Sequence, residues 1–118
     1  MNKLSLILSL IIAPPLFAGE ADVIKVQVDC DTRCNFQVTL KHADTGWDHY
    51  ADQWDVVAPD GRVLGKRVLY HPHVDEQPFT RSLSGVSIPD GIDFVFIRAR
   101  DSVHNYGGVE KRVDLPGR

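Results

Sequence analysis

Short stretches in which apolar and polar residues alternate recur along most of this chain, and turn-forming residues separate them. The clearest is NFQVTLKH at 35–42, in which Phe36, Val38 and Leu40 occupy every second position. Successive side chains of a β-strand point to opposite faces, so this alternation is typical of a strand with one buried face. No segment shows helical periodicity over three turns. The pattern therefore predicts an all-β protein.

Seven segments are predicted to be strands: 23–29, 35–42, 50–58, 62–70, 79–86, 93–101 and 109–115. Pro-Asp-Gly sequences at 59–61 and 89–91 predict turns, because proline presets φ at one turn position and glycine accepts a positive φ at another. The apolar run at 94–97 is typical of a central strand that is covered, at least in part, on both faces. Seven short strands joined by turns predict an antiparallel sandwich of two sheets.

The first and third of these segments indicate which side chains face the core. Ile24, Val26 and Val28 are expected on the buried face of the first, and Trp54 on that of the third. A tryptophan on the third strand, together with the strand count, resembles the immunoglobulin/fibronectin type III class over residues 23–115. The resemblance implies a seven-stranded, antiparallel, immunoglobulin-like sandwich.

The first 18 residues are predicted to be a secretory signal peptide. Lys3 precedes the apolar stretch 4–13, two prolines interrupt it, and Ala18 offers a small residue for cleavage, with Ala21 as the alternative. Cleavage after Ala18 leaves 19–118 as a single β-sandwich domain, periplasmic or secreted. The apolar stretch is about half of a membrane span, so no stable span is expected after cleavage, although a retained anchor stays an alternative. No cysteine follows closely, which argues against lipid attachment there.

The two cysteines, Cys30 and Cys34, are expected to form a disulfide, because an exported protein meets an oxidising environment. They are not placed as in antibody domains, where the disulfide joins the two sheets. Redox chemistry or thiolate metal binding is the alternative. The formal charge is −3, and removing Lys3 makes it −4, which argues against a nucleic-acid partner.

All five histidines fall in connections that a sandwich of this kind gathers at one end. They occur in 42–50, 71–78 and 102–108, and alternate connections of an antiparallel sandwich share an end. Imidazole is the commonest metal ligand in proteins. The sequence therefore predicts a histidine-rich site that is assembled from His42, His49, His71, His73 and His104.

The motif His71-Pro72-His73 is the first choice for metal ligands. Proline keeps the residue before it extended, and side chains two apart in an extended chain point the same way. His42 and His104 are expected to complete the site, with reserve or orienting roles for His49, Asp44, Asp75 and Glu76. Mixed histidine and carboxylate ligands suit Zn²⁺ or Cu²⁺.

Two interpretations without metal stand beside this one. A network of His, Asp and Arg side chains would hold the three loops together, with Arg98 and Arg100 pairing across strands with Asp52 or Asp55. Alternatively, the loops would present aromatic anchors to an envelope protein partner; the candidates are Trp47, Tyr50, Phe79 and Tyr106. No nucleophile-elbow sequence surrounds a serine, so an enzyme is not the expected class.

Overall fold

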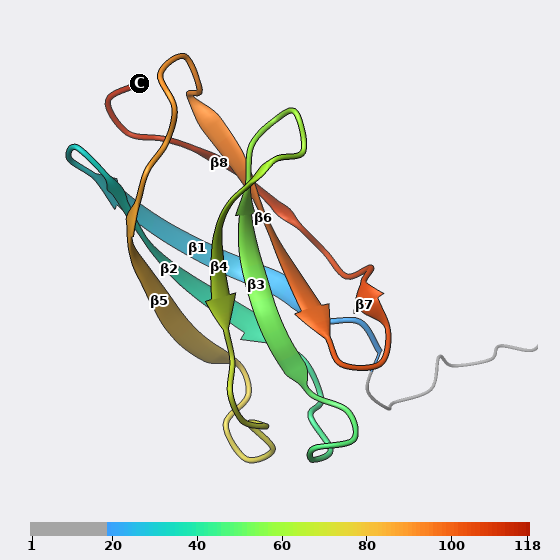
Figure 1. Cartoon of the computed structure of the whole chain (residues 1–118). Helices are drawn as coiled ribbons and strands as arrows, with labels where there is room; N and C mark the ends of the chain where they lie inside the picture. The colour runs from blue at the N-terminus through green and yellow to red at the C-terminus, as the bar shows by residue number, and fades with distance from the viewer. Residues whose placement is uncertain (1–18) are drawn as a thin grey trace, which may run out of the picture.

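The computed structural model describes residues 19–118, which form two antiparallel sheets packed face to face (Figure 1). The all-β, immunoglobulin-like sandwich predicted from the sequence is confirmed. The predicted signal peptide, 1–18, lies outside the described residues. The strands are β1 (Asp22–Cys30), β2 (Cys34–Lys41), β3 (Ala51–Val57), β4 (Val63–Val68), β5 (Phe79–Val86), β6 (Phe94–Asp101), β7 (Asn105–Tyr106) and β8 (Lys111–Asp114).

One sheet has the order β1-β2-β5, and the other has the order β4-β3-β6-β7, with β8 also paired to β6. Seven of these strands correspond to the predicted segments. The short strand β7 is additional, and it pairs Tyr106 with Arg100 and Asn105 with Asp101 on β6. The chain passes from one sheet to the other between β2 and β3 and between β4 and β5, which are two of the connections that carry the histidines.

The core lies between the two sheets and follows the alternation of the sequence. On β2, every second side chain is buried, whereas the intervening residues are exposed or half-buried. Trp54 on β3 is fully buried, as predicted. The largest fully buried apolar side chains are Trp54, Phe36, Phe79, Leu40, Ile97, Val23, Val38, Val56 and Val95.

The prediction for β1 was wrong at its beginning. Val23 is fully buried and Ile24 is 41% exposed, the reverse of the expected pattern. The pairing of β1 with β2 shifts register between Val23 and Lys25, and such a bulge places one extra residue in the strand. The alternation therefore changes phase there, and Val26 and Val28 pack against the core as expected.

Strand β6 carries the alternation directly into the histidine-rich end. Val95, Ile97 and Ala99 point into the core, and Asp101 continues the same parity at the end of the strand. The other face of the strand is only half covered; for example, the Arg112 guanidinium lies 3.8 Å from the centre of the Phe94 ring. Coverage of the apolar run on both faces is thus partial.

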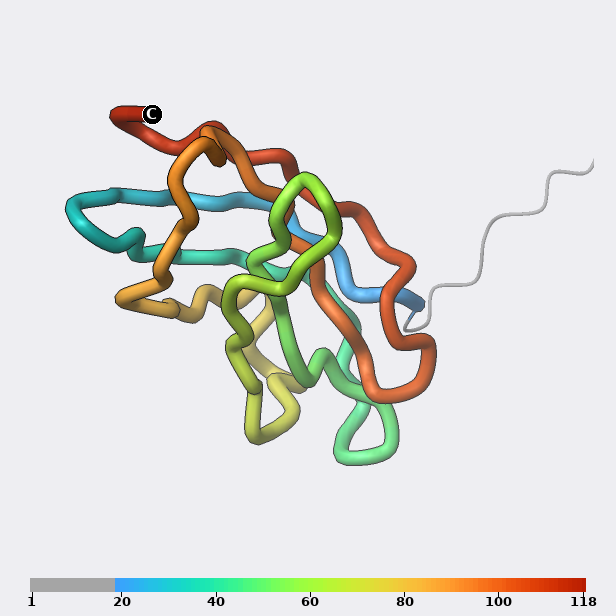
Figure 2. Tube along the Cα trace, turned by 45° about the horizontal axis from the view of Figure 1, so that its top comes forward, coloured from blue at the N-terminus to red at the C-terminus, as the bar shows by residue number. Residues whose placement is uncertain are grey.

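The connections β2–β3, β4–β5 and β6–β7 lie together at one end of the sandwich, at the bottom of Figures 1 and 2. The opposite end carries the tight β1–β2 hairpin and the two Pro-Asp-Gly turns. The predicted convergence of the histidine-bearing loops is therefore present. No helix within residues 19–118 is long and apolar enough to cross a membrane.

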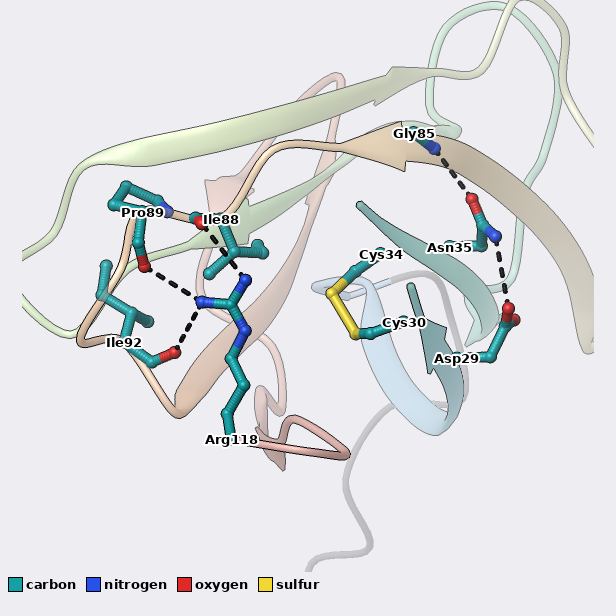
Figure 3. Close-up of a disulfide and its surroundings, with 9 residues drawn as sticks. All are labelled: Asp29, Cys30, Cys34, Asn35, Gly85, Ile88, Pro89, Ile92 and Arg118. Carbon is teal, nitrogen blue, oxygen red and sulfur yellow. Dashed lines mark hydrogen bonds between the residues drawn. A yellow bond between two sulfur atoms is a disulfide. The ribbon is translucent and has the colours of Figure 1, made fainter. Parts of the chain in front are cut away.

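The predicted disulfide between Cys30 and Cys34 closes the β1–β2 hairpin (Figure 3). Asn35 braces it, because its side-chain amide donates to Asp29 and its oxygen accepts from the Gly85 N–H on β5. These bonds tie the hairpin to its neighbouring strand.

Replacing both cysteines by alanine is expected to lower the free energy of unfolding by about 2 kcal/mol, the chain-entropy value for so short a loop. Urea denaturation of the metal-free protein measures this. Loss of the whole fold would contradict a purely local role for the disulfide.

Candidate metal centre

Asp101 lies at the centre of the histidine cluster, at the point where β6 enters its loop. Its side chain is fully buried. Its Oδ1 accepts hydrogen bonds from the backbone N–H of Val103, at 2.8 Å, and of His104, at 2.5 Å. Its Oδ2 lies 3.1 Å from Nδ1 of His104. These bonds fix the carboxylate and turn the chain sharply after the strand.

His42 approaches Asp101 from the other sheet. It follows β2 directly and keeps the inward parity of Leu40, so its ring is buried. Its Nδ1 is 2.5 Å from Oδ1 of Asp44, and its Nε2 is 2.9 Å from the Gly19 carbonyl oxygen and 3.4 Å from Oδ2 of Asp101. Both ring nitrogens therefore face acceptors.

Asp44 holds this imidazole in place and joins two loops. Its Oδ1 also accepts from the Ala51 N–H at 3.1 Å, and its Oδ2 accepts from the His73 N–H at 2.7 Å. Gln77 adds a second link, because its Oε1 accepts from the His42 N–H and its amide donates to the His73 carbonyl. The β2–β3 and β4–β5 loops are thus fastened together.

His49 completes the cluster from the β2–β3 loop. Its ring centre lies 4.8 Å from that of His42 and 4.8 Å from that of His104. Its Nε2 is buried, lies 3.5 Å from Oδ1 of Asp101, and has no hydrogen-bond partner among residues 19–118. Nε2 of His49 is thus a buried ring nitrogen of the cluster that no described residue hydrogen-bonds.

The cluster favours charged carboxylates and a charged His42. Burial lowers the pKa of His42, but the hydrogen bond to Asp44 and the charges of Asp44 and Asp101 outweigh it, so this pKa lies above the usual 6.5. Burial raises the pKa of Asp44, yet the hydrogen bonds from His42, His73 and Ala51 bring it below 3.8. The pKa of Asp101 is also lowered, because hydrogen bonds from the His104 and Val103 N–H groups and from the His104 ring outweigh burial.

One nitrogen each of His42 and His49 and one oxygen of Asp101 all lie within 4.8 Å of one another. Ligands that share a Zn²⁺ at about 2.0–2.2 Å lie about 3–4 Å apart. Each imidazole is at this distance from a different oxygen of Asp101, His42 Nε2 at 3.4 Å from Oδ2 and His49 Nε2 at 3.5 Å from Oδ1. These three side chains are the candidate ligands for a divalent transition metal, and His104 stands beside them.

The chain is 41% identical over 97 residues to a protein of Halomicrobium mukohataei named "Putative lipoprotein". The match covers 80% of this chain and 47% of that protein, so the chain spans about half the length of its relative. No family model matches the chain, and no solved structure matches it significantly.

The other predicted ligands lie apart from this cluster. The rings of His71 and His73 are 6.4 Å apart, and they line a small pocket with two arginines. Glu76 is exposed and pairs with Arg81 at 3.1 Å. The structure therefore groups His42, His49 and His104 with Asp44, and places the His71-Pro72-His73 motif next to cations, where it stays an untested prediction as a metal clamp.

The four predicted partner contacts are not equally available. Trp47 is 66% exposed at the tip of its loop, and Tyr50 packs edge-on against it, with ring centres 5.6 Å apart. Phe79 is buried beneath the His73 ring and cannot serve as an anchor, because the first residue of β5 points into the core. Tyr106 lies on the outer sheet face, where its hydroxyl donates to Asp55 at 2.6 Å.

The predicted cross-strand pairs on that outer face are confirmed. Arg98 pairs with Asp55 at 3.0 Å, and Arg100 pairs with Asp52 at 2.7 Å. Asp55 is fully buried beneath these partners, so this is a covered network rather than an exposed pair. This network stabilises the sheet face next to the histidine cluster. Its arginines pair with Asp52 and Asp55, whereas Asp101 pairs with histidines.

Asp101 is the residue that sequence reasoning missed. The sequence pattern predicts residue 101 only as the end of a strand. The signal was present, because Val95, Ile97 and Ala99 have the same parity as Asp101. A carboxylate on the buried face of a strand needs a partner, and here histidines provide it.

Proposed function

We propose that this chain is an exported, envelope-associated binding protein that holds a divalent transition metal, Zn²⁺ or Cu²⁺, between His42, His49 and Asp101. His104 is the adjacent imidazole that can join the site. Asp44 orients His42 through Nδ1, the usual role of a carboxylate behind a ligating histidine, and a metal at Nε2 would replace the Gly19 carbonyl as the partner of that nitrogen.

The observation that carries this proposal is the charge balance of the cluster. Asp44 and Asp101 are both buried, and both have lowered pKa values. Within residues 19–118, only histidines pair with them; no Lys or Arg does. A buried charge is costly without a counter-charge, so either an imidazolium or a bound cation must balance these carboxylates. A metal and a proton therefore compete for the same place.

The relative supports the location. The name of the relative, "Putative lipoprotein", favours an envelope-associated location, and the expected signal peptide of this chain would direct it out of the cytoplasm. An envelope position places the cluster where extracellular or periplasmic metal ions reach it.

Isothermal titration of the tag-free, metal-free protein with Zn²⁺ and with Cu²⁺ at neutral pH tests the site. One equivalent is expected to bind. His49→Gln is expected to lower the affinity about tenfold or more, because it removes the one free ligand nitrogen. Affinity is expected to fall as the pH is lowered, because protons compete for the imidazoles, and the fall is expected to begin above about 6.5 because the pKa of His42 is raised.

The matched control is His71→Gln, which removes an exposed imidazole of the neighbouring loop and is expected to leave metal affinity unchanged. Absence of stoichiometric binding would overturn the metal site. Loss of binding in His71→Gln but not in His49→Gln would move the site to the His71-Pro72-His73 motif.

A second candidate function is docking of an envelope protein on the same end of the sandwich. Large apolar side chains stand exposed on all three loops: Trp47, Tyr70, Val74 and Val103. Exposed aromatic side chains make good interface anchors. Trp47→Ala together with Tyr70→Ala is expected to abolish partner capture from envelope extracts while metal affinity is retained; unchanged capture would contradict docking at this end.

A further inference from the structure

A small pocket lies beside the cluster of histidines and carboxylates, at the seam where the edge strands of the two sheets meet. Strand β4 ends one sheet and strand β5 ends the other. The Arg67 Nε on β4 crosses this seam and donates to the Ser82 carbonyl on β5 at 2.8 Å. The pocket measures about 90 Å³, and its lining consists of Arg67, Leu69, Tyr70, His71, His73 and Arg81.

The lining is rich in hydrogen-bond donors that are not fully used. A guanidinium has five N–H donors. Within residues 19–118, Arg67 makes two hydrogen bonds, to the carbonyls of Ser82 and Val68. Arg81 also makes two, to the Thr80 carbonyl and to Glu76. Each arginine therefore keeps donors for a further acceptor.

His73 contributes a fixed polar group. The His73 ring stacks on Phe79 with the ring centres 4.0 Å apart. The backbone N–H of His73 donates a hydrogen bond to Asp44. Its Nδ1 is buried and has no hydrogen-bond partner in the described part of the chain. A buried polar atom without a protein partner is usually paired with a water or an ion, so this nitrogen is available to a ligand of the pocket.

The charges at the pocket favour an anion over a cation. Two guanidinium groups line it, whereas the nearby carboxylates are engaged: Asp44 with His42 and backbone N–H groups, and Glu76 with Arg81. Burial and the positive charge of Arg81 hold the pKa of His73 below 6.5, in keeping with a positive local potential. A divalent metal between His71 and His73 would face this repulsion.

The size narrows the ligand class. Pockets for organic cofactors measure about 300–1,000 Å³, well above the volume here. Arginine forks match the planar oxygen pairs of phosphate and carboxylate groups. We propose that this pocket binds a small oxyanion of the phosphate type through Arg67, Arg81 and His73, with His71 and Tyr70 at its rim. The anion is either free in solution or the exposed phosphate of a larger molecule.

Titration of the isotopically labelled, metal-free protein with inorganic phosphate, followed by ¹H–¹⁵N NMR, tests the pocket. Saturable shifts are expected at the Nε–H signals of Arg67 and Arg81 and at the His73 amide. Arg81→Gln is expected to weaken binding about tenfold, because a hydrogen bond to a charged group is lost. Glu76→Gln is expected to strengthen binding, because it frees the Arg81 guanidinium.

Arg62→Gln is the matched control, since Arg62 is an exposed arginine paired with Asp60 in a turn at the opposite end. It is expected to leave phosphate affinity unchanged. His49→Gln is also expected to have no effect, which separates this pocket from the proposed metal centre.

A parallel titration with glycerol phosphate distinguishes the two sources of the anion. Tighter binding of glycerol phosphate supports an organic phosphate or lipid headgroup, whereas tighter binding of inorganic phosphate supports the free ion. The absence of saturable shifts with both probes, or equal effects of Arg62→Gln and Arg81→Gln, would overturn the proposal.

Discussion

Replacing Asp101 by alanine is expected to destabilise the metal-free protein by about 3–5 kcal/mol, the usual cost of removing one partner from a buried charged pair. The fully buried carboxylate accepts two backbone N–H bonds and one from the His104 ring. Its removal leaves these donors unsatisfied and leaves His42 and His49 without their shared counter-charge. Urea denaturation near pH 6 measures the loss.

Two comparisons make this result specific. Asp114→Ala removes a carboxylate that is 82% exposed, and it is expected to change stability by no more than about 0.5 kcal/mol. Asp101→Asn keeps an oxygen for the backbone donors but removes the charge, so it is expected to be less destabilising than alanine while still abolishing metal binding. If Asp101→Ala costs no more than Asp114→Ala, the carboxylate does not anchor the cluster.

The sequence was sufficient to place the loops, because alternation and turn residues mark the strands and successive strands of an antiparallel sandwich run in opposite directions. Once seven strands are assigned, topology alone brings the loops after β2, β4 and β6 to one end. The disulfide followed from the oxidising environment expected for an exported protein, and the pairing of Arg98 and Arg100 with Asp52 or Asp55 followed from their shared strand face. These features depend on local pattern, which a single sequence contains.

The division of the histidines between two places was not predictable in the same way. His71 and His73 do lie close together, but their surroundings are set by Arg67 and Arg81 on two edge strands of different sheets. Packing across that seam depends on sheet twist and loop length, which the sequence pattern does not specify. The bulge after Val23 was also not predictable, because the alternation of apolar and polar residues continues past it and no turn or glycine residue marks its position.

Whether a histidine belongs to a cation site or to an anion site depends on the charged side chains that surround it. Near His42, the partners are the carboxylates of Asp44 and Asp101, whereas near His73 they include the Arg81 guanidinium. Histidine suits both environments, so counting imidazoles alone assigns one function to two chemically different places. Asp44 lies between the two places, because its carboxylate contacts the His42 ring through one oxygen and the His73 backbone N–H through the other.

His42→Gln is expected to cost the metal-free protein more stability at pH 5.5 than at pH 9. The folded-state pKa of His42 is raised above 6.5, so its contribution is fully present below the unfolded value and is lost as the pH rises through the folded one. Asp44 and Asp101 stay charged over this range, because their pKa values are lowered below 3.8. Removing the imidazolium at low pH therefore leaves the buried Asp44 carboxylate without its charged partner and Asp101 with one imidazole fewer, a loss of about 3 kcal/mol or more.

Urea denaturation of both proteins at the two pH values measures the difference. His71→Gln is the control, since this exposed imidazole lies outside the network, and its substitution is expected to change stability by no more than about 0.5 kcal/mol at either pH. A cost of His42→Gln that is the same at both pH values, or larger at pH 9, would show that His42 is not the counter-charge of the two carboxylates. The competition between a proton and a metal for the His42 imidazole, from which the proposed function is argued, would then not exist.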